Sequence, residues 1–399
     1  MNILYIGYWG ANESLSQATI NPHLEILLKN SLVDKLVYTS IERTGHTTHQ
    51  VPKKNQFEHI PLKANKFPFR LINKIYEVIF FRNKLISIAR DYSIDLVICR
   101  SSLAGNFGLT IHKKLKIPFV IESFEPHAEY MRELGVWKKH GLSYLFQKNS
   151  EKKQSKYADR LYPVSENFEK FLIGEGCSKN KIITLPCAVD VEKFSFSKTD
   201  RQDVRTKLKI PENTITAIYV GKFGGIYYSI NQALKLFLEA DAYFKDFHLI
   251  LLTSDNHAVY DALKKSEFPI EKVSCRIVAH DEVPAYLSAS DFAFSLINRT
   301  GFSAFCSPIK NGEYWANGLP ILIPKGIGDD SDILINSGLG VIMNDDTSPQ
   351  DYFDQIVNLI RQKKHRETIC QLAHKHRSFR LIINEYNTLM NRHNSMSLG

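Results

Sequence analysis

The sequence has no run of about 18 consecutive apolar residues, which argues against a membrane-spanning helix. It opens without a basic segment followed by an apolar one, so we expect no signal peptide. Its six cysteines are scattered and include no CxxC pair. This spacing argues against a zinc site and a disulfide framework, and it favours a reducing compartment. We therefore expect a cytoplasmic protein that holds no metal.

Two common nucleotide-binding fingerprints are also missing. After the first apolar segment, "YIGYWGANES" contains Gly7 and Gly10 but not the glycine spacing of dinucleotide-binding dehydrogenases. No GxxxxGK[ST] segment is present either. The chain is therefore unlike a dehydrogenase and unlike a P-loop enzyme.

The excess positive charge is confined to the first half of the chain. Residues 1–200 carry 29 Lys and Arg against 20 Asp and Glu, whereas residues 201–399 carry 22 of each. A basic surface suits binding to nucleic acid, an anionic lipid or a phosphorylated acceptor. The equally weighted alternative is that the lysines only keep the protein in solution.

Short apolar segments alternate with longer amphipathic ones, which predicts parallel sheets covered by helices on both faces. The length exceeds one ordinary core, so we expect two α/β domains of Rossmann type, joined by the polar stretch Asp190–Asp203. Ligands of such sheets bind at the carboxyl ends of the strands. The expected strands span residues 2–8, 35–40, 95–100, 119–123, 160–165, 182–189, 215–221, 247–253, 275–279, 292–297, 320–324 and 340–343.

A glycine-rich connection follows the expected strand 215–221. Lys222 comes directly after Gly221, and Gly224 and Gly225 precede Ser229, which could cap the next helix. Glycines let backbone N–H groups approach a phosphate closely, and lysine adds positive charge. The alternative is a plain turn between a strand and a helix.

A second candidate phosphate site is the short helix expected in "SPIKNGEYWANGLP" (307–320). Ser307 would be its N-cap and Pro308 its first residue, which puts Lys310 at the third position, where the helix dipole disfavours a cation. A bound anion would explain Lys310, and Glu313 could then accept hydrogen bonds from a hydroxyl-rich ligand such as ribose. The alternative is an exposed Lys310–Glu313 pair.

Acidic residues and one histidine follow the expected strand 119–123. Glu122, Glu125, His127 and Glu129 should crowd together at its carboxyl end, where they could orient hydroxyls or exchange protons. A metal site and a polar loop that caps the next helix are the alternatives.

Two segments, 65–90 and 137–157, combine basic and aromatic residues at helical spacing. Helices of this kind suit an anionic membrane surface. Helices packed between a sheet and its neighbours would have a similar composition.

Together these segments resemble the GT-B fold glycosyltransferases, in particular the retaining enzymes of family 4, over nearly the whole chain. "SPIKNGEYWANGLPILI" is the most specific match and resembles their donor-site helix. "YVGKFGG" is similar to their phosphate loop, and "SFEPHAEYM" to a subset that makes bacterial surface polysaccharides. The other matching segments are 164–194, 283–296 and the last helix, 377–390.

The resemblance implies two Rossmann-like domains facing across a cleft. Residues 1–195 would bind the acceptor, 196–378 the nucleotide sugar, and 379–399 would form a helix that packs back on the first domain. Glu313 would hold the donor ribose, and Lys222 would belong to the diphosphate loop. The expected donor-binding residues are Gly221, Gly224, Gly225, Ser307, Pro308, Ile309 and Glu313, and the expected catalytic residues are Glu125, His127, Lys222 and Lys310.

The activity implied is metal-independent, retaining transfer of a sugar from a nucleotide diphosphate sugar, with UDP favoured over GDP and no cofactor. The expected acceptor is a glycan or a polyprenyl-linked intermediate of polysaccharide synthesis, with no nucleic acid partner. Attachment to the inner face of the cell membrane stays open.

Two departures from the family pattern keep other functions open. Phe305 stands where the family has a glutamate, and no second lysine lies near Tyr227. A catalytically inactive binding module and a nucleotide-sugar epimerase are the alternatives.

Overall fold

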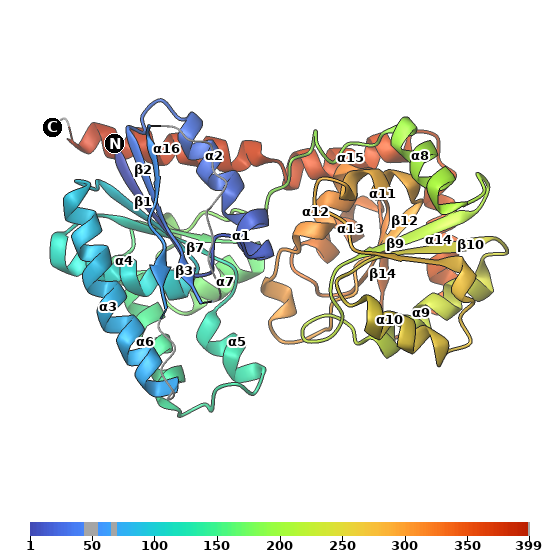
Figure 1. Cartoon of the computed structure of the whole chain (residues 1–399), viewed down its shortest axis with the longest axis horizontal. Helices are drawn as coiled ribbons and strands as arrows, with labels where there is room; N and C mark the ends of the chain where they lie inside the picture. The colour runs from blue at the N-terminus through green and yellow to red at the C-terminus, as the bar shows by residue number, and fades with distance from the viewer. Residues whose placement is uncertain (44–54, 65–69, 398–399) are drawn as a thin grey trace. The chain divides into compact units, whose positions relative to one another are not determined.

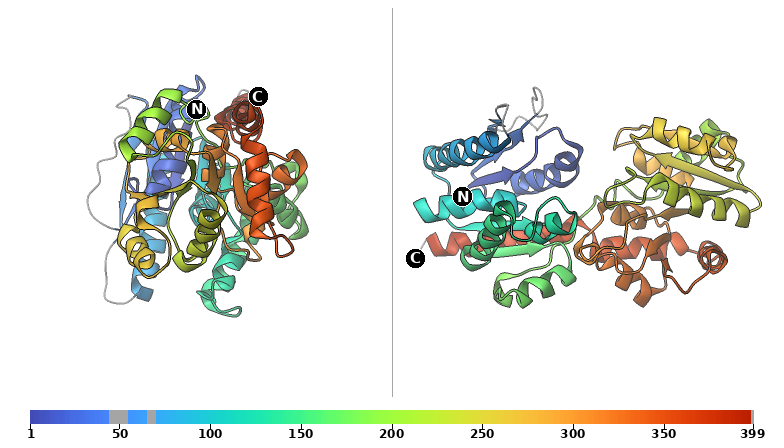
Figure 2. Two further views of the ribbon diagram at one scale, coloured as in Figure 1. Left: turned by 90° about the vertical axis from the view of Figure 1, so that its right-hand side faces the viewer. Right: turned by 90° about the horizontal axis from the view of Figure 1, so that it is seen from below.

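The computed structural model of the chain describes residues 1–43, 55–64 and 70–397. It divides into two compact units: unit 1 comprises Met1–Leu185 with Arg380–Gly399, and unit 2 comprises Pro186–Phe379. Each unit is a parallel sheet with helices on both faces (Figure 1, Figure 2), as expected for two Rossmann-like domains. None of the described helices has the length and hydropathy needed to cross a membrane.

The sheet of unit 1 has the strand order β4-β2-β1-β6-β7-β8. The order reverses between β1 and β6, so the carboxyl ends of these two strands form the place where such sheets bind ligands. The strands are β1 (Asn2–Gly7), β2 (Lys35–Thr39), β3 (Ile41–Glu42), β4 (Phe57–His59), β5 (Leu62–Lys63), β6 (Leu96–Arg100), β7 (Phe119–Ser123) and β8 (Arg160–Pro163). The helices are α1 (Ser14–Thr19), α2 (Asn21–Lys29), α3 (Arg70–Asp91), α4 (Ser102–Leu115), α5 (His127–Glu133), α6 (Leu142–Tyr157), α7 (Glu166–Gly174) and α16 (Phe379–Ser397).

The C-terminal helix α16 packs on unit 1, beside the strands coloured blue to green in Figure 1 and Figure 2. A buried carboxylate holds it there. Glu122, at the end of β7, accepts hydrogen bonds from Tyr386 of α16, from Tyr5 at 2.6 Å and from Arg100 at 2.9 Å. His23 Nδ1 lies 3.2 Å from the same carboxylate. Hydrogen bonds to a charged group contribute about 1.5–3 kcal/mol each, so this cluster fixes α16 on the sheet.

The Glu122 cluster predicts a pH-dependent stability. Burial alone would raise the pKa of Glu122, but the charges of His23 and Arg100 and its hydrogen bonds hold it well below its usual range. Since the unfolded carboxyl binds protons near pH 4.3, this stabilisation is present above that pH and is lost as the pH falls. We expect Glu122→Gln to lower the free energy of unfolding by about 3 kcal/mol at pH 7, and the difference from the parent should shrink below about pH 4. Urea unfolding of the parent and the variant at pH 7, 5, 4 and 3 measures this difference in unfolding free energy.

The control is Glu25→Gln, the same change on the exposed face of α2. It should leave the unfolding free energy of the parent unchanged at every pH. A Glu122→Gln variant as stable as this control would show that the cluster does not hold α16.

The sheet of unit 2 has the order β11-β10-β9-β12-β13-β14, which reverses between β9 and β12. Its strands are β9 (Ile215–Val220), β10 (Phe247–Leu252), β11 (Val273–Arg276), β12 (Phe292–Phe294), β13 (Ile321–Pro324) and β14 (Val341–Met343). Its helices are α8 (Lys198–Leu208), α9 (Ile230–Tyr243), α10 (Asn256–Lys264), α11 (Val283–Ala289), α12 (Ile309–Ala316), α13 (Asp330–Ser337), α14 (Pro349–Ile360) and α15 (His365–His376).

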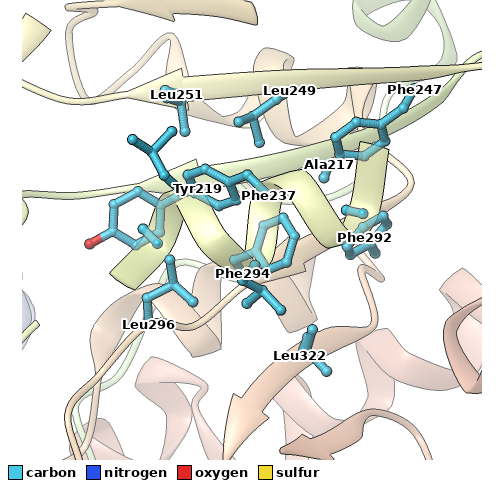
Figure 3. Close-up of a cluster of buried hydrophobic side chains, with 14 of the residues drawn as sticks. Ala217, Tyr219, Phe237, Phe247, Leu249, Leu251, Phe292, Phe294, Leu296 and Leu322 are labelled. Atoms are coloured by element: carbon cyan, nitrogen blue, oxygen red, sulfur yellow. The ribbon is translucent and has the colours of Figure 1, made fainter. Parts of the chain in front are cut away.

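Successive residues of the unit 2 strands pack on opposite faces of the sheet. Ala217 and Tyr219 belong to a core with Phe237 of α9 (Figure 3), whereas Ile218 belongs to a core with Trp315 of α12. Because a strand buried on both faces has no polar side, its apolar run is continuous. This is why the sequence predicted most of these strands; the exception is β11, which was expected at 275–279 and spans Val273–Arg276.

Two expectations about the middle of the chain were wrong. Residues 182–189 form no strand; only single bridges involve Ile182 and Val189. The expected linker Asp190–Asp203 is part of unit 2, because Phe194 is buried in its core and α8 begins at Lys198. The division between the units falls instead at Leu185 and Pro186.

Candidate functional site

The glycine-rich connection of unit 2 follows β9, at the point where the strand order reverses. Gly221 has a φ of +150°, and a Cβ atom placed on it would lie 2.7 Å from Lys310 Nζ. Gly224 and Gly225 have φ values of +83° and +64°, which side chains disfavour. Glycine at 221 therefore lets the lysine of α12 reach the end of β9.

Some backbone N–H groups of this loop are free to bind a ligand, but those of Gly221 and Gly224 are not. The Gly221 amide donates to Leu252 O and the Gly224 amide to Tyr228 O. Within the part of the chain that the structure describes, the amides of Lys222, Gly225 and Ile226 donate to no protein acceptor. These three amides are free to bind an anion.

The short helix α12 begins differently from the expectation. It starts at Ile309 with Pro308 as the N-cap, and no side chain caps it. The Ser307 hydroxyl instead accepts hydrogen bonds from the Cys187 amide, at 3.0 Å, and from Arg377. Lys310 is thus the second helical residue, not the third, because Arg377 draws the Ser307 side chain away from the first turn.

Lys310 is held between the glycine loop and an aromatic ring. Its ammonium lies 5.0 Å from the ring centre of Tyr227, close to Gly221. Burial lowers the pKa of Lys310, Glu313 raises it and Lys222 lowers it further. No carboxylate of the described residues lies within 4.0 Å of the ammonium. Lys222 is exposed. Lys310 is therefore a desolvated cation that has no acidic partner.

Glu313 is buried one turn further along α12. It accepts a hydrogen bond from His280 Nε2 at 2.9 Å, and the His280 ring is half exposed. The next residue, Tyr314, accepts a hydrogen bond from the Val220 amide at 3.0 Å. This bond ties α12 to the end of β9 and so fixes Lys310 and Glu313 against the glycine loop.

A buried polar cluster that the sequence reading missed supports the first turn of α12. Arg377 forms an ion pair with Asp330, and the side-chain amide of Asn311 donates to the same carboxylate at 2.8 Å. Gly312 makes room for it, since a Cβ atom there would lie 3.2 Å from Arg377 Cβ. Arg377 and Asp330 are 47 residues apart, so no local spacing could have revealed the pair.

The acidic residues expected to crowd together in unit 1 belong to separate networks. Glu122 accepts a hydrogen bond from Tyr386 of α16, and Glu129 pairs with Arg132 of α5 and Lys148 of α6. Only Glu125 and His127 lie together, with 3.0 Å between Glu125 Oε1 and His127 Nδ1. The β7 strand explains the difference, because Glu122 is still within it and points into the core.

Two further features of unit 1 were not predicted. Glu151 accepts hydrogen bonds from Ala128, Gln147 and Ser102, and burial raises its pKa. Trp9, after β1, contacts Phe124, after β7, at 6.2 Å between ring centres. These aromatic side chains follow the carboxyl ends of two strands of one sheet, a position that suits a sugar ligand.

The expected basic and aromatic helices are partly described. Residues 65–69 lie outside the described residues, and α3 covers most of the rest of that segment. In the second segment, α6 exposes Leu142, Leu145 and Phe146. No group of three or more His, Cys, Asp or Glu side chains that could hold a metal ion occurs in the described chain.

Comparison with known proteins gives matches in sequence and in structure. Residues 42–193 match the profile of the family described as Glycosyltransferase Family 4. Sucrose-phosphate synthase from Thermosynechococcus elongatus has a similar structure, with a TM-score of 0.76, 13% identity and coverage of 99% of both chains. A comparison with curated protein sequences gave no match.

Two more solved structures are similar to the chain. Anabaena HepE in complex with UDP has a TM-score of 0.70, 12% identity and coverage of 98% of this chain and 100% of its own. The lipopolysaccharide outer core galactosyltransferase WaaB has a TM-score of 0.64, 16% identity and coverage of 97% and 98%.

The chain has the GT-B fold, and its residues 42–193 match glycosyltransferase family 4. In this GT-B chain the family match covers most of unit 1, whereas the loop after β9 and helix α12 lie outside it, in unit 2. The expected family resemblance and fold class are confirmed.

Proposed function

We propose that the chain is a retaining glycosyltransferase that binds a nucleotide diphosphate sugar, with UDP as the nucleotide, in unit 2. The proposal rests on two features that occur together in unit 2. One is the set of free loop amides with the unpaired Lys310 ammonium, and the other is the buried Glu313 carboxylate. The amides and the cation suit a diphosphate, and the carboxylate suits the two hydroxyls of a ribose. Anabaena HepE, which has a similar structure, is in complex with UDP, and this supports the choice of nucleotide.

The reaction would need no metal ion. The bond between the sugar C1 and the diphosphate oxygen breaks, and the acceptor hydroxyl oxygen bonds to C1 from the same face, which retains the configuration. The proton of that hydroxyl passes to the departing phosphate. Lys310, Lys222 and the free amides would stabilise the charge that develops on the leaving group.

Unit 1 would bind the acceptor, a glycan or a polyprenyl-linked sugar. Glu125 and His127 would line that site, and Trp9 with Phe124 would stack on a sugar ring. The exposed Leu142, Leu145 and Phe146 of α6, with the net positive charge of this half, would hold the protein on the anionic inner face of the membrane.

Calorimetric titration with UDP, GDP and ADP, with and without magnesium, tests the donor site. We expect UDP to bind with micromolar affinity, independently of magnesium. Glu313→Ala should weaken the binding about 10–150-fold, because a hydrogen bond to a charged group contributes about 1.5–3 kcal/mol. Glu267→Ala, the same change at an exposed position, is the control.

Phe305 favours a second candidate, a GT-B module that binds the nucleotide sugar without turnover. Its side chain contacts Phe302, with ring centres 5.5 Å apart, and cannot accept a hydrogen bond from a sugar hydroxyl. Nucleotide binding without transfer to any of a broad panel of acceptors would favour this module. No binding of the three nucleotides would contradict both candidates.

A further inference from the structure

A groove of about 630 Å³ lies in unit 1 between α6 and α7, above the strands β7 and β8. This volume is within the range of small-molecule sites, about 300–1,000 Å³. The proposed donor site in unit 2 does not use this groove, but its lining includes Glu125, which the proposed function assigns to the acceptor site. The side chains that matter here are the apolar Ile121, Leu145, Leu161, Phe168, Phe171 and Leu172, and the basic Lys148, Lys152, Lys156 and Lys181.

The apolar side chains come from all the elements around the groove. Ile121 and Leu161, on adjacent strands, are buried, whereas Leu145 of α6 and Phe171 of α7 keep part of their apolar surface exposed. Apolar surface that remains open in a groove gains free energy when a hydrocarbon covers it. The groove therefore suits an apolar ligand.

The lysines around the groove fall into two groups. Lys148 pairs with Glu175, at 2.7 Å, and so links α6 to the end of α7. Lys152, Lys156 and Lys181 have no acidic partner within 4.0 Å among the described residues, and Lys181 donates to the backbone carbonyls of Lys156 and Ala158. Three carboxylates also line the groove, but each has a partner: Glu175 pairs with Lys148, Glu125 pairs with His127, and Glu151 accepts hydrogen bonds from Ala128, Gln147 and Ser102. The three lysines without an acidic partner therefore make the groove suited to an anion.

The apolar interior continues onto the surface. Leu145 lines the groove and is 48% exposed, and its neighbours Leu142 and Phe146 are 88% and 60% exposed. These residues occupy positions i, i+3 and i+4 of α6 and therefore share one face of the helix. A hydrocarbon chain can thus pass from a membrane into the groove along an apolar path.

We propose that the groove binds one hydrocarbon chain of an anionic membrane lipid, with its head group against Lys152, Lys156 and Lys181. The charge of the lysines and the apolar lining select together for an amphiphile, since neither a free anion nor a neutral hydrocarbon uses both. The lipid would hold the protein on the membrane at one defined site, in addition to general attraction to an anionic surface. This inference does not depend on glycosyl transfer.

Titration of the full chain with dodecyl phosphate, below the concentration at which it forms micelles, tests the proposal. Dodecyl phosphate should bind at one site, about 3–4-fold more tightly for each methylene added from octyl phosphate onward, until the groove is full. Inorganic phosphate and dodecyltrimethylammonium should bind at least tenfold more weakly. Equal binding of the anionic and the cationic amphiphile would overturn the proposal.

Three variants locate the site. Lys152→Glu combined with Lys156→Glu should weaken dodecyl phosphate binding at least tenfold, whereas Lys153→Glu, which is exposed on the same helix but does not line the groove, should change it less than twofold. Ser155→Trp should fill the groove and abolish binding. Undiminished binding by the folded Ser155→Trp variant would assign the lipid to the outer face of α6 instead. UDP binding, measured in parallel, reports on unit 2 and separates failure of this proposal from failure of the proposed function.

Discussion

Lys310→Met should lower the rate of UDP release from a bound UDP-sugar by about 100–1,000-fold, the effect of removing one preorganised donor from developing negative charge. The substitution keeps the length of the side chain and its contact with Tyr227, so the fold should be unchanged. Removing a desolvated cation that lacks an acidic partner should not lower stability. The loss should therefore appear in kcat, with a smaller effect on UDP-sugar affinity.

The pH dependence gives an independent measure of Lys310. In the proposed mechanism only protonated Lys310 stabilises the leaving group, and burial lowers the pKa of Lys310 below that of an ordinary lysine. The rate should therefore fall as the pH rises through this lowered pKa, and the residual activity of Lys310→Met should lack this alkaline decline. Initial rates measured between pH 6 and 10 test it.

Two lysine variants serve as comparisons. Lys207→Met makes the same change at an exposed position of α8, before β9 begins, and should leave the rate unchanged. Lys222→Met should have an intermediate effect, because Lys222 is exposed and water screens its charge. A larger loss in Lys222→Met than in Lys310→Met would contradict the assignment of Lys310 as the main cation.

The features that sequence reasoning found are local ones. A buried parallel strand, a glycine that follows it and a lysine near a helix start are visible within about ten residues. The two sheets and the positions of Gly221, Lys310 and Glu313 at the end of β9 and on α12 follow from such patterns. The first turn of α12 did not, because its geometry depends on Arg377, 70 residues after Ser307.

The same reasoning explains the errors in unit 1. Glu122, Glu125 and Glu129 are close in the sequence, but Glu122 has a distant partner, and Glu129 pairs with Lys148 of α6 as well as with the nearby Arg132. Tyr386 of the C-terminal helix, 264 residues away, donates a hydrogen bond to Glu122. Glu151 of α6 is buried by the fold, which its sequence neighbours did not indicate. Proximity in sequence predicted one pair, Glu125 and His127, for which the structure gives a direct contact.

The buried pair of Arg377 and Asp330 should have the largest effect on stability. Arg377→Met leaves the Asp330 carboxylate buried with the Asn311 amide alone. Loss of one partner of a buried ion pair costs about 3–5 kcal/mol, so we expect unit 2 to unfold at a much lower urea concentration. Arg361→Met, at an exposed position, is the control and should change the unfolding free energy by less than about 0.5 kcal/mol.

Trp315 provides a reporter for this measurement. It is buried in unit 2, 5.7 Å from the Arg377 guanidinium, whereas the other two tryptophans, Trp9 and Trp137, lie in unit 1. In a background in which Trp9 and Trp137 are replaced by Phe, the fluorescence of Trp315 follows the unfolding of unit 2 alone. Urea unfolding in this background measures how much each variant lowers the free energy of unfolding of unit 2.

A double-mutant cycle separates the pair from its individual residues. Arg377→Met with Asp330→Asn removes both charges, so the double variant should be destabilised by less than the sum of the two single changes. Because the pair also fixes Ser307 and Asn311 at the start of α12, both single variants should weaken UDP binding under conditions in which unit 2 is still folded. Additive losses, or single variants that bind UDP as tightly as the parent, would mean that the cluster stabilises the core of unit 2 without positioning the donor helix.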